Sequence, residues 1–435
     1  MTAAITSIAP RAVTNSRTAK YLRDFLLGIL PIMFGAQLFG WIAFFPQALH
    51  GNSDFRQLYT AAYMIRTGRG HQLYDYQAQK QLQDALVSRE ELALPFIRPA
   101  YQAVVMVPFS LFRYRTAYLL FLALNLGLLA LCFSLLRPHM RNLSAAWSWL
   151  PPAMLFTFLP VNVALMQGQD SILLLALLAA AFVALHRGRG FAAGTLVGLG
   201  LFKLQIVIPI AILFFAWRRW RFSAGFALSS AFAMGVSLWV IGLAQAKVFV
   251  QSLFAVGGAV APAANQIKFP LRTTLMANLR GLVAGLTAGR LSSRTILILT
   301  ILLSGAVLAL AIRLLRKQAS VDAMLLAITA SVVVSYYLFI HDLSVLLIPI
   351  LVILDRYIGL SGATGGSEGL AAILAASLFV APICLFLIPA HFYVVALPIC
   401  GLLLTLSLRG EKIRNMWPIA HVTELSNPQD REHGN

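Results

Sequence analysis

Residues 187–221 read RGRGFAAGTLVGLGLFKLQIVIPIAILFFAWRRWR. Arginines bound this apolar run on both sides, and a single lysine, Lys203, lies near its middle. Basic clusters beside apolar segments are typical of the cytoplasmic side of a membrane. Because both ends favour that side, we expect a hairpin of two short helices that turns near Lys203, Leu204 and Gln205 inside a protein cavity. One long tilted helix is the alternative.

The whole chain has the composition of a membrane protein. Of its 435 residues, 59% are hydrophobic and 11% are charged, and the mean hydropathy is +0.80. This leaves too little polar surface for a water-soluble protein of this size. The net charge of +19 lies mostly in short clusters between apolar runs, so we expect cytoplasmic loops and no nucleic-acid partner. The three cysteines lack metal-ligand spacing, which argues against a zinc site or a disulfide framework.

The apolar runs predict an all-α polytopic protein with about 12 transmembrane helices and both termini in the cytoplasm. The run at 99–112 is short and contains Pro108, so we expect it to be re-entrant or interfacial. The predicted parts are a cytoplasmic N-terminus at 1–23, a membrane domain at 24–408 and a flexible cytoplasmic tail at 409–435. The runs themselves are 24–45, 99–112, 116–136, 147–165, 169–186, 191–217, 221–243, 293–313, 322–339, 342–357, 368–388 and 391–408.

Two long loops, at about 46–115 and 244–292, face outward in this topology. In the first, apolar residues recur at helical spacing from Phe55, which predicts an amphipathic helix lying on the membrane. A second such helix is predicted from Tyr76 to about Val87, with Asp75 as its N-cap and a Lys80–Asp84 pair one turn apart.

Asp54 precedes the first of these helices and has two interpretations. As a helix N-cap it would pair with Gln57, three residues on, in a capping box. As a carboxylate at the rim of the first span, it could instead act as a general base that takes a proton from an attacking hydroxyl.

Several short motifs, taken in order, resemble glycosyltransferase family 87 over roughly residues 50–350. Members of that family use polyprenol-phosphate sugars and have the GT-C fold. The chain departs from the family pattern at Leu204, where proline often follows the lysine, and at Arg98, which replaces a second proline and places a cation near the site. The motifs are Ser53-Asp54-Phe55, Tyr59-Thr60-Ala61-Ala62, Leu73-Tyr74-Asp75, Arg98-Pro99-Ala100-Tyr101 with Pro108, Gln167-Gly168-Gln169, Phe202-Lys203-Leu204-Gln205 and His341-Asp342-Leu343.

The resemblance implies an inverting transfer in which Asp54 deprotonates an acceptor hydroxyl and a lipid phosphate leaves. A departing phosphate develops negative charge, so the site needs fixed cations. His341 is a candidate for catalysis or phosphate binding, since a protonatable imidazole at the cavity mouth can donate to a phosphate oxygen. The residues expected to contact substrate are Lys203, Arg98, Lys268, Arg272, Arg280, Gln167, Gln169 and Tyr59.

Each candidate also has a structural interpretation. Lys203 could snorkel to the outer headgroups, and the cations of the second loop could be solvated or touch anionic lipids. The two glutamines could cap a helix turn. His341 could belong to an interfacial aromatic belt in which Asp342 caps the next helix.

A transporter or flippase for a lipid-linked sugar is the main alternative function. It should show paired broken helices in two related halves, and the sequence has only one such hairpin. A membrane scaffold without a site is a third possibility. It predicts no clustering of polar groups, whereas Asp54, Arg98, Gln167, Lys203 and His341 all fall on the outer side of the topology.

The expected partners are a polyprenyl-phosphate sugar donor, a lipid or glycan acceptor and membrane lipids. No metal or other cofactor is expected, because no pair of carboxylates lies close enough in sequence to share an ion. Mannose is the familiar donor sugar of the family, although no residue selects it over another hexose. We expect the protein in a bacterial-type inner membrane with its site on the outer face. The oligomeric state stays open.

Overall fold

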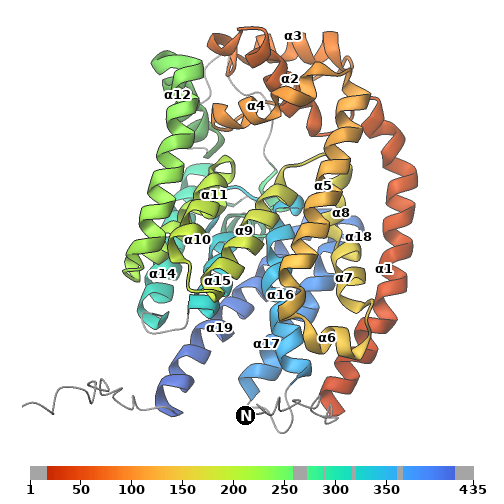
Figure 1. The fold of residues 1–435 in the computed structure, drawn as a ribbon, viewed down its shortest axis with the longest axis vertical. Helices are drawn as coiled ribbons and strands as arrows, with labels where there is room; N and C mark the ends of the chain where they lie inside the picture. The colour runs from red at the N-terminus through yellow and green to blue at the C-terminus, as the bar shows by residue number, and fades with distance from the viewer. Residues whose placement is uncertain (1–16, 258–271, 289, 316–319, 360–365, 417–435) are drawn as a thin grey trace, which may run out of the picture.

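A computed structural model describes residues 17–257, 272–288, 290–315, 320–359 and 366–416. This part of the chain is all-helical. Six of its helices are long and apolar enough to cross a membrane, or seven if one bent pair counts as a span. These spans are α1 (Arg17–Leu49), α5 (Tyr114–Leu136), α12 (Trp220–Gly257), α14 (Ser293–Leu315) and the segments built on α17 (Gly366–Val380) and α19 (Ala396–Met416). Figure 1 shows α1, α5 and α12 running lengthwise along the outside of the molecule.

The remaining predicted spans are shorter or broken, so the expected number of about 12 is not shown. The run at 147–165 forms two short helices, α7 (Leu150–Thr157) and α8 (Leu159–Met166), which are separated at Phe158. Pro160 accounts for the break, because proline inside a continuous helix removes a hydrogen bond and clashes with the preceding turn. The helix α9 (Ser171–His186) has 16 residues. It therefore rises about 24 Å, less than the hydrocarbon core of about 30 Å.

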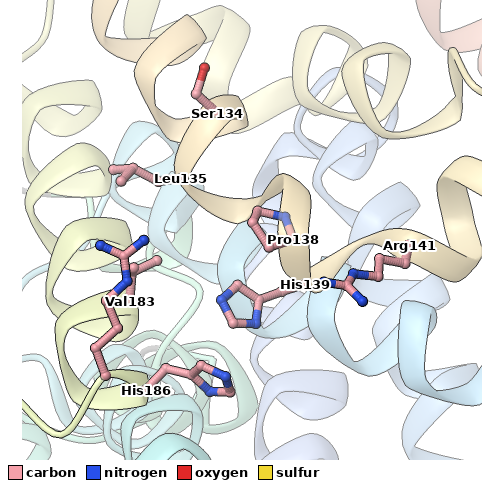
Figure 2. A pocket seen from close by; sticks show the side chains of 8 residues that line it. Ser134, Leu135, Pro138, His139, Arg141, Val183 and His186 are labelled. Atoms are coloured by element: carbon pink, nitrogen blue, oxygen red, sulfur yellow. The ribbon is translucent and has the colours of Figure 1, made fainter. Parts of the chain in front are cut away.

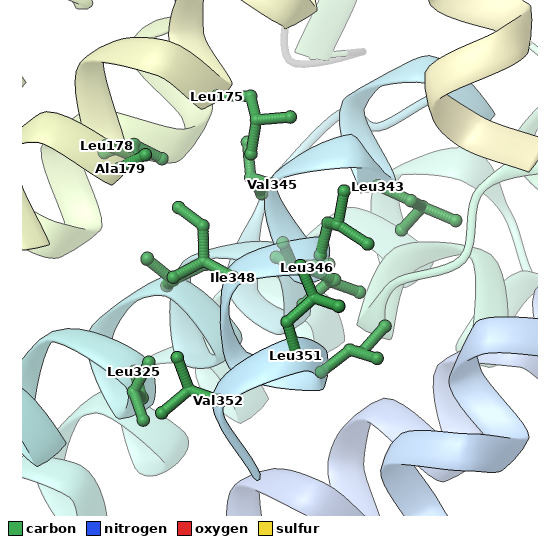
Figure 3. Packing of buried hydrophobic residues seen from close by; sticks show 14 of the residues in the cluster. Leu175, Leu178, Ala179, Leu325, Leu343, Val345, Leu346, Ile348, Leu351 and Val352 are labelled. Atoms are coloured by element: carbon green, nitrogen blue, oxygen red, sulfur yellow. The ribbon is translucent and has the colours of Figure 1, made fainter. Parts of the chain in front are cut away.

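Some short helices lie in the interior, where they need no contact with lipid. Helix α9 is apolar all round and is almost entirely buried, as expected of a central helix. It packs beside α15 (Ser320–Val334) and against the 3-10 helix η6 (Ile340–Leu346), which leads into α16 (Leu347–Ile358). Figure 3 shows Leu175 and Leu178 of α9 near Val345 and Ile348.

The run 191–217 is a broken helix pair. Helix α10 (Gly190–Leu199) and helix α11 (Leu204–Ala216) are bent by 64° around the 3-10 turn η4 (Leu201–Lys203). The start of α10 and the end of α11 lie close together. A Cβ atom added at Gly190, the first residue of α10, would lie 3.6 Å from the Cβ atom of Arg221, which follows the end of α11 closely in the chain. The chain thus turns back at Lys203, as the flanking arginines predicted.

The predicted outer-loop helices gather at one end of the molecule, the top in Figure 1. Helix α2 (Phe55–Arg66) contacts α3 (Tyr76–Leu86) and α4 (Ala100–Met106). The predicted cap of α3 is present, since Asp75 accepts from the backbone N–H groups of Gln77 and Ala78. The predicted Lys80–Asp84 ion pair is also present.

Several boundaries differ from those predicted. Helix α1 begins at Arg17 rather than at residue 24, and residues 1–16 lie outside the described part. Helix α12 continues past residue 243 to Gly257, through a non-helical Gly242, so it takes up the start of the second predicted loop. Helix α19 extends to Met416, and the rest of the predicted tail lies outside the described residues.

Candidate active site

Asp54 occupies the N-cap position of α2, but its carboxylate makes no capping hydrogen bond. The capping-box interpretation with Gln57 is therefore wrong. Instead, Gln169 Nε2 donates to Asp54 Oδ2 at 2.5 Å. Asp54 is half-buried, so it can still be reached from outside. A carboxylate that is oriented by a side-chain amide and not engaged by its own helix is suited to accept a proton.

The Gln-Gly-Gln turn between α8 and α9 also holds the backbone at Asp54. The Asp54 backbone N–H donates to Gln167 Oε1 at 3.1 Å, and the Phe55 N–H donates to the Gln167 carbonyl oxygen at 2.9 Å. Gly168 has a φ of +57°, and a Cβ atom there would lie 2.7 Å from Phe55 Cβ. Glycine is required here by both the backbone conformation and the close approach of α2.

Arg98 connects this turn to a buried acid that the sequence analysis missed. Its guanidinium donates to Gln169 Oε1 at 2.9 Å and also binds Asp170 Oδ2. Asp170 is fully buried and accepts from Gln102 as well. Its position directly before an apolar helix could have identified Asp170 in the sequence. A carboxylate there is expected to be buried, and a buried carboxylate requires a cationic partner.

Lys203 lies between two buried carboxylates. Its ammonium donates to Asp342 Oδ1 at 2.7 Å and lies 3.3 Å from Asp170 Oδ1. The lysine is 1% exposed, so it does not snorkel to the headgroups. Two formal positive charges, on Arg98 and Lys203, thus face two formal negative charges inside the protein.

Asp342 caps a helix, as predicted, and also binds Lys203, which was not predicted. Its Oδ2 accepts from the Phe339 backbone N–H at 3.1 Å, at the start of η6, while Oδ1 receives Lys203. The Ser171 hydroxyl donates to Oδ1 at 3.3 Å. This carboxylate therefore joins the start of α9, the turn of the broken pair and η6.

His341 is buried beside this cluster. Its Nε2 lies 3.6 Å from Asp342 Oδ1 and has no hydrogen-bond partner among the described residues. An unpartnered buried imidazole nitrogen is a group that a ligand could satisfy.

The other predicted substrate contacts lie elsewhere or outside the described residues. The hydroxyl of Tyr59 donates to the Phe112 carbonyl oxygen at 2.9 Å, and burial raises the pKa of Tyr59, which favours this donor form. Arg280 is buried and donates to the Tyr336 carbonyl oxygen at 3.0 Å. Arg272 is exposed at the start of a 3-10 turn, and Lys268 lies outside the described residues.

Residues 96–339, more than half of the chain, match the model of glycosyltransferase family 87. The chain belongs to glycosyltransferase family 87. Searches of curated proteins and of solved structures give no match. The family 87 match contains Arg98, the Gln-Gly-Gln turn, Asp170 and Lys203, while Asp54 precedes it and His341 follows it. Membership implies an enzyme that acts on a sugar donor and an acceptor.

Proposed function

We propose that this protein transfers a hexose, in the first instance mannose, from a polyprenyl-phosphate donor to a lipid or glycan acceptor. The transfer proceeds with inversion and Asp54 is the general base. Asp54 takes the proton of the acceptor hydroxyl, whose oxygen attacks the anomeric carbon. The bond from that carbon to the phosphate oxygen breaks, and the lipid phosphate leaves with the electron pair.

The hydrogen bond from Gln169 to Asp54 is the observation that carries this proposal. It orients one carboxylate oxygen, while Asp54 Oδ1 accepts no hydrogen bond from the described residues and stays available to the acceptor. The same glutamine is held by Arg98. The base is thus linked through one amide to the buried cations, and a positioned base of this kind contributes about 10²- to 10⁴-fold to a rate.

Three groups support binding of the donor phosphate. His341 Nε2 has no hydrogen-bond partner in the part of the chain that the structure describes. Lys203 has three N–H donors, of which Asp342 accepts one. Arg98 contributes a second fixed cation. Because the two cations are already positioned by carboxylates, they need little reorganisation when charge develops on the leaving phosphate.

We propose that this site faces outward, with both termini in the cytoplasm of a bacterial-type cell. The basic loops support this orientation, since 137–141 follows α5 and 187–189 follows α9, at the ends away from Asp54 and Asp170. Short helices such as α7, α8 and α9 would complete a GT-C bundle of about 12 crossing segments.

The test uses purified protein in liposomes with a radiolabelled polyprenyl-phosphate hexose and a lipid-extract acceptor. We expect labelled sugar to move to the acceptor in the wild-type protein and the polyprenyl phosphate to be released. An intact donor that accumulates on the opposite leaflet would instead identify a flippase and overturn the proposal. Comparing mannose with other hexoses on the same lipid would identify the sugar.

A further inference from the structure

A surface hollow lies at the far end of α9 from the Asp54 cluster. Its volume is about 470 Å³, and it is formed by the end of α5, the 3-10 turn η3 (Arg137–His139) with Arg141, and the last turn of α9. Asp170 and His186 stand at opposite ends of the 16-residue helix α9. About 24 Å of helix therefore separates this hollow from the proposed site of sugar transfer.

The hollow brings together four basic side chains and no acid. His139, Arg141, His186 and Arg187 all line it, and none of its lining residues is acidic. The rings of His139 and His186 meet edge to face, with centroids 4.6 Å apart. Figure 2 shows these two rings reaching the hollow from different elements, with Arg141 beside them.

Arg141 and Arg187 have no competing partner among the described residues. In the part of the chain that the structure describes, neither Arg141 nor Arg187 forms a side-chain hydrogen bond or an ion pair, and both are exposed. By contrast, Arg98 and Lys203 each form an ion pair with a buried carboxylate. Guanidinium groups that line a concave surface and carry no carboxylate partner are suited to bind an anion, because their planar donors match phosphate oxygens in pairs.

We propose that this hollow is a binding site for a phosphate group, separate from the site of sugar transfer. Leu135, Pro138 and Val183 form an apolar wall beside the basic residues. Leu131, one turn earlier on α5, is 48% exposed. The wall thus continues onto an apolar helix surface, which fits the phosphate of an anionic phospholipid, although a free phosphate offers the same chemistry.

The alternative to a binding site is that these arginines only form part of a basic loop surface. Two pairs of variants separate it from a site. Arg141→Gln with Arg187→Gln removes the lining charges. Arg137→Gln with Arg189→Gln removes two exposed arginines from the same loops that do not line the hollow. Both pairs change the net charge equally, so only a localised site distinguishes them.

Binding is measured by titration calorimetry on the full chain in a neutral detergent, with inorganic phosphate and dihexanoyl-phosphatidylglycerol as probes. We expect the R141Q/R187Q protein to bind about tenfold more weakly or worse, and the R137Q/R189Q protein to stay within about threefold of wild type. Tighter binding of the lipid identifies a headgroup site, and equal or tighter binding of phosphate identifies a free anion. Equal weakening by both pairs, or no binding of either probe to wild type, overturns the proposal. Thermal melts without probe confirm that both variants are folded.

Discussion

Lys203 Nζ donates to Asp342 Oδ1 at 2.7 Å, although 139 positions separate the two residues in the chain. Both side chains are almost fully buried, and Asp170, the second neighbour of the ammonium, is buried as well. Charges taken out of water depend on their partners, because desolvation is costly. The pair therefore holds the turn of the broken helix against η6 and positions the cation beside His341.

Removing either member of this pair should destabilise the protein. We expect Lys203→Met to lower the free energy of unfolding by about 3–5 kcal/mol, because it leaves the buried Asp342 carboxylate without its lysine partner. Adding Asp342→Asn should restore at least about 1 kcal/mol relative to the sum of the single effects. Unfolding in an SDS titration measures these energies. The matched control is the exposed pair Arg356–Asp322, whose removal should cost less than about 1 kcal/mol.

Asp54→Asn should lower the rate of sugar transfer by about 10²- to 10⁴-fold, since the amide cannot accept the proton. Stability should stay unchanged, because the carboxylate caps no helix. Asp75→Asn is the control, because Asp75 does cap α3 and asparagine also caps well. If the Asp54 variant turns over nearly as fast as the wild-type protein, Asp54 is not the general base.

Gln169→Ala should reduce the turnover number by about 10²-fold, because the base loses the amide that orients it. Gln57→Ala should change neither turnover nor stability by a measurable amount, since no capping box is present. Steady-state kinetics and thermal melts on both variants check this. A destabilised Gln57 variant would revive the capping interpretation, and an unaffected Gln169 variant would show that Asp54 needs no support.

Gly168→Ala should impair transfer more than Gly188→Ala does. Both glycines have positive φ, so both substitutions carry a backbone strain of about 1 kcal/mol or more. At Gly168 the new methyl group meets Phe55, whereas no atom of the described residues lies within 4 Å of the position at Gly188. We expect a displaced Asp54 and lower turnover in the first variant alone. Equal activities would mean that the close approach is unimportant for catalysis.

His341→Asn should raise the KM for the donor by about tenfold, because the buried imidazole nitrogen is proposed to bind the phosphate. The exposed His391 provides a matched control, and His391→Asn should leave the KM unchanged. Donor titrations at saturating acceptor measure both. If the turnover number falls while the KM does not change, His341 acts on the leaving group and not in donor binding.

The membrane class, the turn at Lys203, the two helices that begin at Phe55 and Tyr76 and the cap at Asp75 could all be predicted from local patterns. Apolar runs, flanking arginines and a single capping residue act over a few positions, so the sequence alone carries them. The number of long spans could not be predicted in this way. Whether an apolar run is continuous or broken depends on interior packing, as α7, α8 and α9 demonstrate.

The family and most candidate side chains also followed from the sequence, since the order of short motifs identified them. Their partners did not. Asp170 was missed, Asp342 was taken as a cap alone, and whether the Asp54 carboxylate caps α2 was left open. Only the tertiary structure decided these points, because a buried charge takes its partner from whichever chain segment folds against it, here up to 139 positions away.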